Sequence, residues 1–390
     1  MTISIRGVRE VLLLLLLFAM ILDPTRSMFR MTEIVFVAFL VASIRVANFK
    51  YLPIILFFYF SYFFSLFFNI ASADFETDRV FSLLLALSFT FMLLFVSYFK
   101  RLFQYFFVCT IIMSVVVLAL VIAFFLNKTI AMAFIISFRN EFGNILFTES
   151  KAFLSLALVS VFYKSSPIVI LSLAYSLVQL LTRKSRLYLV TSLLLSTSLF
   201  FSGTRANIFA GVLVLIFTGL FYLFFERKKQ VVATALLFLA LGFSLVMTFL
   251  FVSQKGEASL EIKNLHQVSY LYVFSDDLLR SITSGFGPGS LFYSEGFGQY
   301  VASTELSYLE LFRNYGLLNG IVIVALFGLP IVKVLASSLY SPFQKSTLAF
   351  SMLAYLFVAG TNPFLNSMLG YLYLTLAFAC SEHNVFAFGK

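Results

Sequence analysis

Residues 102–126 read LFQYFFVCTIIMSVVVLALVIAFFL and contain no charged side chain. An α-helix of about 20 apolar residues is long enough to cross the hydrocarbon core of a lipid bilayer. The apolar run is continuous and does not alternate every second residue, which favours a helix over a strand of a membrane β-barrel. This stretch therefore predicts a membrane-spanning helix, and similar stretches recur along the chain.

The composition of the whole chain points the same way. The protein is 61% hydrophobic and 11% charged, whereas a soluble domain is about 45–50% apolar and about 25% charged. A water-soluble protein of 390 residues could not bury so much apolar surface in one core. In lipid, backbone polar groups must be satisfied inside the protein, so helices are the expected spanning elements. We therefore expect an all-α, polytopic membrane protein with a single transmembrane domain over residues 1–390.

Twelve apolar segments are predicted to cross the membrane. They are residues 3–22, 31–47, 51–72, 79–99, 102–126, 150–182, 187–201, 206–225, 230–252, 307–335, 346–361 and 364–380. The segment 150–182 is too long for one upright helix and is interrupted by Lys164-Ser165-Ser166-Pro167. Taken alone, it could be one long broken crossing or two short ones.

The charges between the segments decide the count. If 150–182 crosses once, both termini and the short basic loops lie in the cytoplasm, as the positive-inside rule requires. Those loops carry Arg6, Arg9, Arg45, Lys50, Lys100, Arg101, Arg183, Lys184, Arg186, Arg227, Lys228, Lys229, Lys333, Lys345 and Lys390, and most carboxylates then lie outside. The formal charge of +10 is therefore a topology signal, and we expect no nucleic-acid partner.

Two segments on the predicted outer side are longer than simple connections. Residues 127–149 form one external loop, and residues 253–306 form a larger external loop between spans nine and ten. Long loops on a rigid scaffold often carry function. A functional site is therefore expected on the outer face.

Arg205 is the first candidate site residue, in the sequence Ser202-Gly203-Thr204-Arg205. A helix N-terminus carries free N–H groups and a partial positive charge, and an arginine adds a planar fork that suits phosphate. We expect Arg205 to stabilise an anion during catalysis. The alternative is an arginine that only extends its charge from the helix end to water.

Arg139 and a glycine-rich turn are further candidates in the two external loops. Arg139 could bind substrate, or it could be a solvated arginine paired with Glu141. The turn Gly285-Phe286-Gly287-Pro288-Gly289-Ser290 includes Gly287 and Gly289 and could form a backbone nest for an oxyanion or simply a tight turn. It has neither a preceding strand nor a Gly-Lys-Ser/Thr sequence, which excludes a nucleotide-binding loop.

Residues 304–320 supply the last group of candidates. On a helix, Glu305, Tyr308 and Phe312 would share one face, and Arg313 would lie beside it. A carboxylate at the mouth of a helical bundle suits general base catalysis. A surface network of the Glu305–Arg313 type is the alternative.

Metal binding is the less favoured interpretation of the acidic residues. Asp74, Glu76 and Asp78, and the pair Asp276-Asp277, could hold a divalent metal, but solvated loops explain them more simply. The two histidines, His266 and His383, share no zinc-ligand spacing. We expect neither a metal nor a cofactor.

Taken in order, these elements resemble the O-antigen polymerase and O-antigen ligase superfamily of bacterial envelope enzymes. The resemblance covers about residues 135–380. It rests on Arg139 with Gly143 before Thr148-Glu149-Ser150, on Ser-Gly-Thr-Arg at 202–205, on Gly-Phe-Gly-Pro-Gly at 285–289, on Tyr308-Leu309-Glu310-Leu311 before Gly316-Leu317-Leu318, and on Asn362-Pro363.

The chain departs from the ligase pattern at two places. Ligases of this superfamily usually carry a His-Asn pair where this chain has Glu305-Leu306. They also tend to have an arginine early in the large loop, where this chain has His266-Gln267 and its nearest arginine, Arg280, is displaced. A glutamate at position 305 is more in keeping with the polymerases.

The resemblance implies glycosyl transfer at the outer face of the bacterial inner membrane. The donor would be a glycan on undecaprenyl diphosphate, and the acceptor a sugar hydroxyl of a second lipid-linked repeat unit. Glu305 would be the base, with Arg205, Arg139 and Arg280 facing the departing diphosphate. Tyr308, Gly287, Gly289 and Arg313 would contribute to substrate binding. A chain-length regulator and a flippase of the same pathway are the protein partners implied.

A ligase that transfers finished polymer to a lipid or protein acceptor is the first alternative function. A flippase for the same lipid-linked unit is an alternative of a different class. A flippase would be expected to line a central cavity with charges inside its spans, but the ionisable residues here gather at the span ends. This distribution favours an enzyme at the membrane surface.

Overall fold

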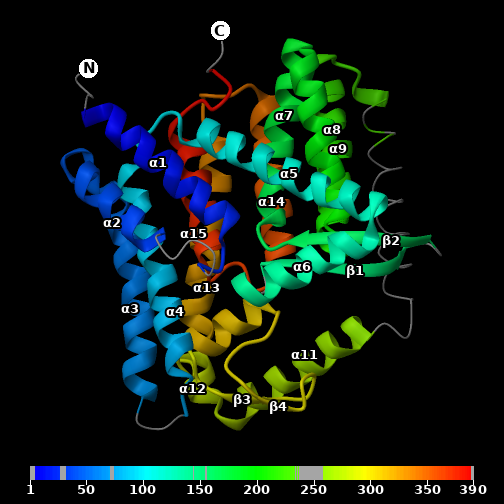
Figure 1. Cartoon of the computed structure of the whole chain (residues 1–390). Helices are drawn as coiled ribbons and strands as arrows, with labels where there is room; N and C mark the ends of the chain where they lie inside the picture. The colour runs from blue at the N-terminus through cyan, green and yellow to red at the C-terminus, as the bar shows by residue number, and fades with distance from the viewer. Residues whose placement is uncertain are drawn as a thin grey trace.

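The computed structural model describes residues 5–387 except 27–31, 71–73, 144, 154–155, 233, 235 and 237–257. The described chain is mostly helical (Figure 1). Its α-helices before residue 200 are α1 (Ile5–Leu22), α2 (Thr32–Ser43), α3 (Leu52–Asn69), α4 (Thr77–Ser88), α5 (Leu102–Leu126), α6 (Lys128–Phe142), α7 (Val169–Arg183) and α8 (Arg186–Phe201). The later ones are α9 (Arg205–Phe221), α11 (Ala258–Asp276), α12 (Leu278–Ile282), α13 (Ser307–Ala336), α14 (Pro342–Gly360) and α15 (Met368–Glu382).

Six helical segments within the described residues are long and apolar enough to cross a membrane. They are Phe49–Asn69, Thr77–Phe95, Leu102–Leu126, Ser166–Arg183, Arg205–Glu226 and Ser307–Ala336. Several combine an α-helix with a short 3₁₀ or π turn, such as Phe89–Phe95 after α4 and Tyr222–Glu226 after α9. The helices α8 and α15 are apolar but shorter. The predicted span 230–252 falls almost wholly outside the described residues.

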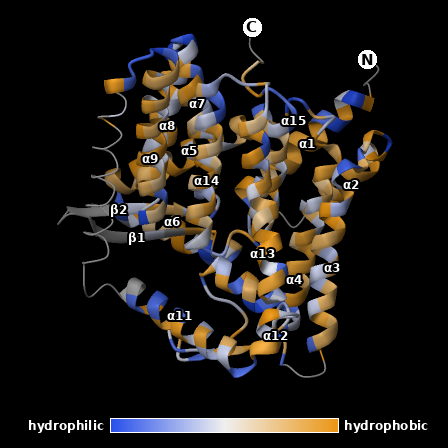
Figure 2. Ribbon diagram, turned by 180° about the vertical axis from the view of Figure 1, so that it is seen from behind, coloured by the Kyte–Doolittle hydropathy of each residue, from blue (hydrophilic) through white to orange (hydrophobic). Residues whose placement is uncertain are grey.

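Hydrophobic residues dominate the middle of the molecule, and hydrophilic residues gather toward its two ends (Figure 2). The helices α7 and α15 are the most enclosed: every residue of Val169–Gln179 and of Met368–Cys380 is buried. Small hydroxyl side chains join neighbouring helices, as where Thr110 of α5 meets Ser172 of α7 at 2.6 Å and Ser176 of α7 meets Thr191 of α8 at 2.7 Å. Such contacts are typical of helix packing in membranes, where the hydrophobic effect between helices is weak.

A β-hairpin occupies part of a predicted span. Strands β1 (Leu146–Phe153) and β2 (Leu156–Tyr163) pair antiparallel, so the prediction of a helix over 150–182 is wrong for its first half. The second half is helical, since the 3₁₀ turn Ser166–Ile168 leads directly into α7. The chain changes direction near Pro167, where the sequence suggested an interruption. The short apolar run at 156–163 meets the hydrogen-bonding needs of its backbone through β1 and not through a helix.

The two predicted external loops contain regular structure. Residues 127–149 hold α6 and the first part of β1. The described part of 253–306 holds α11, α12 and a small hairpin of β3 (Phe292–Ser294) and β4 (Gln299–Val301). The helices α11 and α12 and the β3–β4 hairpin lie together at the bottom of Figure 1, at the opposite end from the start of α1, whereas α6 and β1 lie at mid-height. Glu305 precedes the first helical residue of α13, so it does not share a helical face with Tyr308 as predicted.

A kink in α13 fixes the glycine turn in place. Gly316 has φ +78° and interrupts the helix. The carbonyls of Arg313 and Asn314 instead accept hydrogen bonds from the backbone N–H groups of Phe286 at 2.7 Å and Gly287 at 3.2 Å. The two segments approach so closely at Gly285 and Gly316 that a Cβ on either residue would lie 2.4 Å from a backbone atom of the other segment.

The close approach at Gly285 predicts a large cost for a single methyl group. Gly285 has φ +66°, and a Cβ there would lie 2.4 Å from the N atom of Gly316. We expect Gly285→Ala to lower the free energy of unfolding by about 1–3 kcal/mol, because it adds both strain and a backbone clash. Thermal unfolding of the purified protein in detergent measures the change.

The matched control is Gly328→Ala in α13, where a Cβ would meet nothing within 4 Å. That substitution should be neutral or stabilise the protein by up to about 1 kcal/mol. Equal melting temperatures for the two variants would contradict the packing described for Gly285.

Candidate functional site

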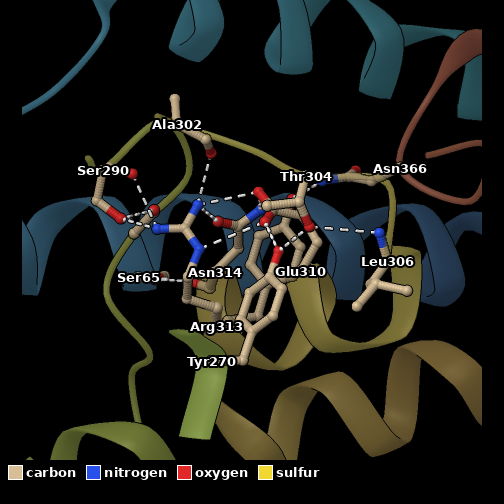
Figure 3. Close-up of polar contacts among 12 residues, drawn as sticks. Ser65, Tyr270, Ser290, Ala302, Thr304, Leu306, Glu310, Arg313, Asn314 and Asn366 are labelled. Carbon is tan, nitrogen blue, oxygen red and sulfur yellow. Dashed lines mark hydrogen bonds and ion pairs between the residues drawn. The ribbon is translucent and has the colours of Figure 1, made fainter. Parts of the chain in front are cut away.

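A buried arginine joins the 277–306 region to α13. The side chain of Arg313 is fully shielded from solvent. One terminal nitrogen, Nη1, donates to the carbonyl of Ser290 at 2.8 Å and to its hydroxyl at 2.6 Å. The other, Nη2, donates to the carbonyl of Ala302 at 2.7 Å (Figure 3). The guanidinium also lies 4.5 Å from the ring centre of Phe292. The loop on both sides of the β3–β4 hairpin is therefore bound to one side chain.

The carboxylate of Glu310 balances this charge. It accepts from Arg313 Nη2 at 2.9 Å, from Asn314 Nδ2 at 3.1 Å and from the hydroxyl of Tyr270 at 2.7 Å. Tyr270 also meets the hydroxyl of Thr304 at 2.9 Å, which links α11 to the same network (Figure 3). Burial, and then the charge of Glu310, raise the pKa of the Tyr270 hydroxyl well above its ordinary value. We call these residues, Tyr270, Ser290, Ala302, Thr304, Glu310, Arg313 and Asn314, the buried network.

The sequence suggested that Arg313 either binds substrate or pairs with Glu305 at the surface, and the structure instead places it in the buried network. Its ion-pair partner is Glu310, one helical turn away, and not Glu305. Its donors are used by protein acceptors, which gives Arg313 a structural role in the described chain. Substrate binding by Arg313 stays a prediction. Sequence reasoning missed Glu310 and Tyr270 as its partners, although the i, i+3 spacing of Glu310 and Arg313 in an apolar helix was a usable signal.

An apolar groove adjoins the buried network at Tyr270. It has a volume of about 420 Å³ and runs between α11, the start of α13 and the end of α14. Its lining is Gln267, Tyr270, Leu271, Phe274, Leu306, Tyr308, Leu309 and Gly360. Tyr270 belongs to both structures, since its ring lines the groove and its hydroxyl enters the network. Tyr308, a predicted substrate-binding residue, donates to the carbonyl of Leu356 at 2.8 Å and packs closely against Gly360.

Charged residues stand at the rim of this groove. Glu305 directly precedes the lining residue Leu306, and its side chain is 52% exposed. It lies 3.5 Å from Nζ of Lys263, which also donates to the carbonyl of Thr361 at 3.2 Å. Lys263 and Gln267 are one turn apart on α11, so the ion pair is positioned by the same helix that forms one wall. The predicted base thus lies at the edge of an apolar groove, next to a cation.

His266 was passed over as a site residue, and the structure places it close to this rim. Its side chain is fully buried; Nδ1 meets the hydroxyl of Ser294 at 2.9 Å, and Nε2 has no hydrogen-bond partner in the described chain. Burial lowers the pKa of His266; the charge of Glu305 opposes this shift and that of Lys263 adds to it. The histidine is therefore a neutral imidazole near neutral pH. His266 of α11 and Glu305, which precedes α13, are brought within electrostatic range of each other by the fold.

Arg205 lies at the start of α9, as the sequence predicted, and is half-buried. The acceptor oxygens of Thr204 and Asn207 beside it are buried and have no hydrogen-bond partner within the described residues. One turn further on, Phe209 packs on Phe357, their ring centres 6.0 Å apart. Because Phe357 lies one turn before the end of α14, the start of α9 and Gly360 are at the same end of the bundle.

The remaining predicted residues form a separate group or lie apart. Arg280 donates to the side chain of Asn69 and lies 4.9 Å from the ring centre of Phe286. Gly287 approaches Asn69 as well, while Gly289 packs on Val80 of α4. Burial lowers the pKa of Arg280, and the Asp277 carboxylate opposes this shift. These contacts are structural, and anion binding by Arg280, Gly287 and Gly289 stays a prediction.

Arg139 is exposed in the last turn of α6, which packs on β1. On the other side of the hairpin, Gly203 approaches Ser160 of β2 so closely that a Cβ would lie 2.1 Å from the Ser160 Cβ. The hairpin therefore stands between Arg139 and the turn that carries Arg205. Within the described chain, no group of three or more His, Cys, Asp or Glu residues could hold a metal ion.

The buried network predicts a large effect of removing one charge. Glu310→Gln leaves the guanidinium of Arg313 buried without its counter-ion, which costs about 3–5 kcal/mol of stability. Thermal unfolding in detergent and the rate of protease cleavage within residues 277–306 measure the loss. Glu295→Gln is the matched control, because Glu295 is exposed in the same region. The account of the network fails if both variants unfold at the same temperature.

The buried imidazole predicts a dependence of stability on pH. Because the folded-state pKa of His266 lies below its ordinary value, the unfolded chain takes up a proton first as the pH falls. The contribution is fully present above the ordinary histidine pKa of about 6.5 and is lost on acidification. The melting temperature should fall more between pH 7.5 and pH 5 in the wild type than in His266→Gln. Identical pH profiles for His266→Gln and wild type would exclude this role.

The chain matches no protein-family model, and no curated protein and no solved structure is similar to it.

Proposed function

We propose that this protein is a glycosyltransferase of the bacterial inner membrane that polymerises lipid-linked oligosaccharide repeat units. It would transfer a growing glycan from undecaprenyl diphosphate to a sugar hydroxyl of a new lipid-linked unit. The observation that carries the proposal is the position of Glu305, an accessible carboxylate at the rim of an apolar, tyrosine-lined groove in a protein with membrane-length helices. The resemblance of its motifs to the O-antigen polymerase and ligase superfamily adds the reaction class.

The groove suits one part of an amphiphilic substrate. Its lining is mainly leucine and aromatic, with Gln267 as a polar side chain, while the hydroxyls of Tyr270 and Tyr308 are bonded to Glu310 and to the carbonyl of Leu356. Apolar and aromatic faces pack well on sugar rings and on polyprenyl chains. The charged pair of Glu305 and Lys263 at the rim would then face the polar end of the substrate.

The proposed chemistry is a substitution at the anomeric carbon. The acceptor oxygen forms the new C–O bond while the bond from that carbon to the diphosphate breaks, and the diphosphate leaves with the electron pair. Glu305 takes the proton of the acceptor hydroxyl, as a general base worth about 10²–10⁴-fold in rate. Arg205 would stabilise the charge that develops on the leaving diphosphate, whereas the contacts of Arg280 with Asn69 and of α6 with β1 keep Arg280 and Arg139 in other parts of the fold.

The proposed topology has twelve crossings, with both termini in the cytoplasm and the groove on the outer side. Figure 1 supports an even number, because α1 begins and α15 ends at the same end of the molecule, opposite α11 and α12. Basic residues of the α7–α8 turn, Arg183 to Arg186, lie at that same end, as the positive-inside rule predicts for the cytoplasmic face (Figure 2).

A ligase is the second candidate, and one observation favours it. Ligases of the resembled superfamily use a histidine near the position of Glu305, and the fold brings His266 within electrostatic reach of that glutamate. The acceptor would then be a lipid core or another final acceptor instead of a repeat unit.

The glycan ladder of the cell envelope tests these proposals. In a deletion strain, surface glycan of one repeat unit means polymerase, and lipid-linked polymer that never reaches its acceptor means ligase. Complementation with Glu305→Gln should reduce chain length sharply at normal protein level, because the base contributes about 10²–10⁴-fold. Glu295→Gln, which removes an exposed carboxylate of the same region, should restore the wild-type ladder.

Arg205 is tested in the same strain. Arg205→Ala should abolish polymer, and Arg205→Lys should restore only part of it, because lysine lacks the planar fork for two phosphate oxygens. Wild-type polymer from Glu305→Gln would remove Glu305 from the mechanism. Full activity of Arg205→Lys would remove bidentate recognition.

A further inference from the structure

The helix α11 turns hydrogen-bonded polar side chains toward the protein. On this buried side, His266 meets the hydroxyl of Ser294 at 2.9 Å, and Tyr270 enters the buried network. The hydroxyl of Ser269, also buried, accepts from the backbone N–H of Glu295 at 2.8 Å. A surface helix in water is expected to turn its apolar side inward and its polar side outward. The polar side of α11 instead faces the β3–β4 hairpin and α13.

The opposite side of α11 exposes large apolar side chains, and α12 continues it. Val268, Leu271 and Tyr272 have the spacing of three and four residues that places them on one helical face. Leu271 is 67% exposed, and Leu279 of α12 is 75% exposed. Residues 264–275 contain no aspartate, glutamate, lysine or arginine. We call the exposed residues Leu265, Val268, Leu271, Tyr272, Leu278 and Leu279 the apolar face.

The apolar face lies at the level where α3 ends. Arg280 of α12 donates to the side chain of Asn69, the last residue of α3, and Asn69 donates to the carbonyl of Gly285 at 3.0 Å. After α3, the backbone N–H of Glu76 donates to the carbonyl of Gly289 at 2.9 Å. Figure 1 shows α12 beside the lower ends of α3 and α4. Hydrogen bonds therefore fix α12 next to the last turn of α3.

That last turn is itself apolar and exposed. Phe67 is 76% exposed, and Phe63, Phe68 and Ile70 are exposed as well. They belong to or directly follow Phe49–Asn69, a segment long and apolar enough to cross a membrane. Exposed phenylalanine rings on such a helix face lipid, so the hydrocarbon extends to the end of α3. A contiguous exposed apolar surface of this kind marks contact with a membrane or a protein.

We propose that the apolar face of α11 and α12 lies in the lipid at this end of the bundle, so that both helices are interfacial. An interfacial helix lies along the membrane with its apolar side at the boundary of headgroups and acyl chains. In Figure 1, α11 runs obliquely across the bottom of the molecule, whereas α3 is upright. Tyr272 adds a polar tip to an aromatic ring, which suits this boundary. Lipid is favoured over a protein partner because the face adjoins the lipid-facing end of α3.

The groove then opens toward the same lipid. Leu271 belongs both to the apolar face and to the lining of the groove. An amphiphile in this leaflet would reach the groove without leaving the hydrocarbon. This consequence rests on the proposed function, because it takes the groove as the substrate site. The position of the apolar face in lipid does not.

Fluorescence quenching of the full-length protein in lipid vesicles tests the proposal. Val268→Cys and Leu279→Cys are labelled with a bimane fluorophore and reconstituted in phosphatidylethanolamine and phosphatidylglycerol. Nitroxide-labelled phospholipid should lower the emission of both by about twofold or more, and aqueous iodide should have little effect. Phe67→Cys in α3 should behave in the same way. The native cysteines, Cys109 and Cys380, are buried, so the wild type gives the background of labelling.

The matched control is Glu295→Cys in the β3–β4 hairpin. Glu295 is exposed, and its hairpin packs on the buried side of α11, away from the apolar face. Iodide should quench this label strongly, and nitroxide-labelled lipid should not. Equal elution of the variants and the wild type on size exclusion shows that the fold is kept.

Two results would overturn the proposal. Iodide quenching at Val268→Cys and Leu279→Cys as strong as at Glu295→Cys would place the apolar face in water. Protection of both positions from both quenchers would place it against a second copy or another protein. The measurements use no glycan substrate, so lipid quenching together with an unchanged glycan ladder in the deletion strain would refute the proposed enzyme and keep the membrane surface.

Discussion

The burial of one guanidinium group organises the end of the molecule that carries the groove. Each of the three nitrogens of Arg313 donates to a protein acceptor, from the loop at Ser290 and Ala302 to the carboxylate of Glu310. A charge without water is tolerated only when all such partners are in place. The loop, α11 and the first turns of α13 must therefore fold together. Tyr270 extends this constraint to the groove, because its hydroxyl belongs to the network and its ring to the wall.

The sequence predicts the helical membrane character well and the local exceptions poorly. A long uncharged segment such as 102–126 satisfies its backbone hydrogen bonds in lipid by forming a helix. The helix α5 covers the same residues. The run at 156–163 is short and rich in valine, and periodicity alone cannot tell such a strand from a buried helix. The hairpin depends on pairing between β1 and β2. A criterion that considers the length and hydrophobicity of one segment at a time cannot predict such pairing.

The candidate site shows the same division. Glu305 and Tyr308 were predicted from residue type and from their place before a long apolar helix, and they do lie at one groove. Tyr270 and Glu310 are 40 positions apart, and His266 reaches Ser294 across 28. Such contacts depend on how α11 packs against α13 and the β3–β4 hairpin, and a local sequence pattern does not predict this packing. The sequence predicts a turn at the glycine-rich segment. It does not predict the partner of that turn, the carbonyls of Arg313 and Asn314 at the α13 kink, because they belong to another element.

The β1–β2 hairpin also limits the shape of the surrounding bilayer. A two-stranded sheet has an outer edge on each strand, and unpaired backbone groups cannot face hydrocarbon. The lipid on that side must therefore end where the hairpin begins, at the level of the turn between α8 and α9. The helix α8 has 16 residues, about 24 Å of rise, while α13 has 30 residues, about 45 Å along its kinked course. The protein would thus sit in a membrane of unequal thickness, thinned beside α8. A polyprenyl chain near that thin flank would have a shorter path from the hydrocarbon to the outer surface.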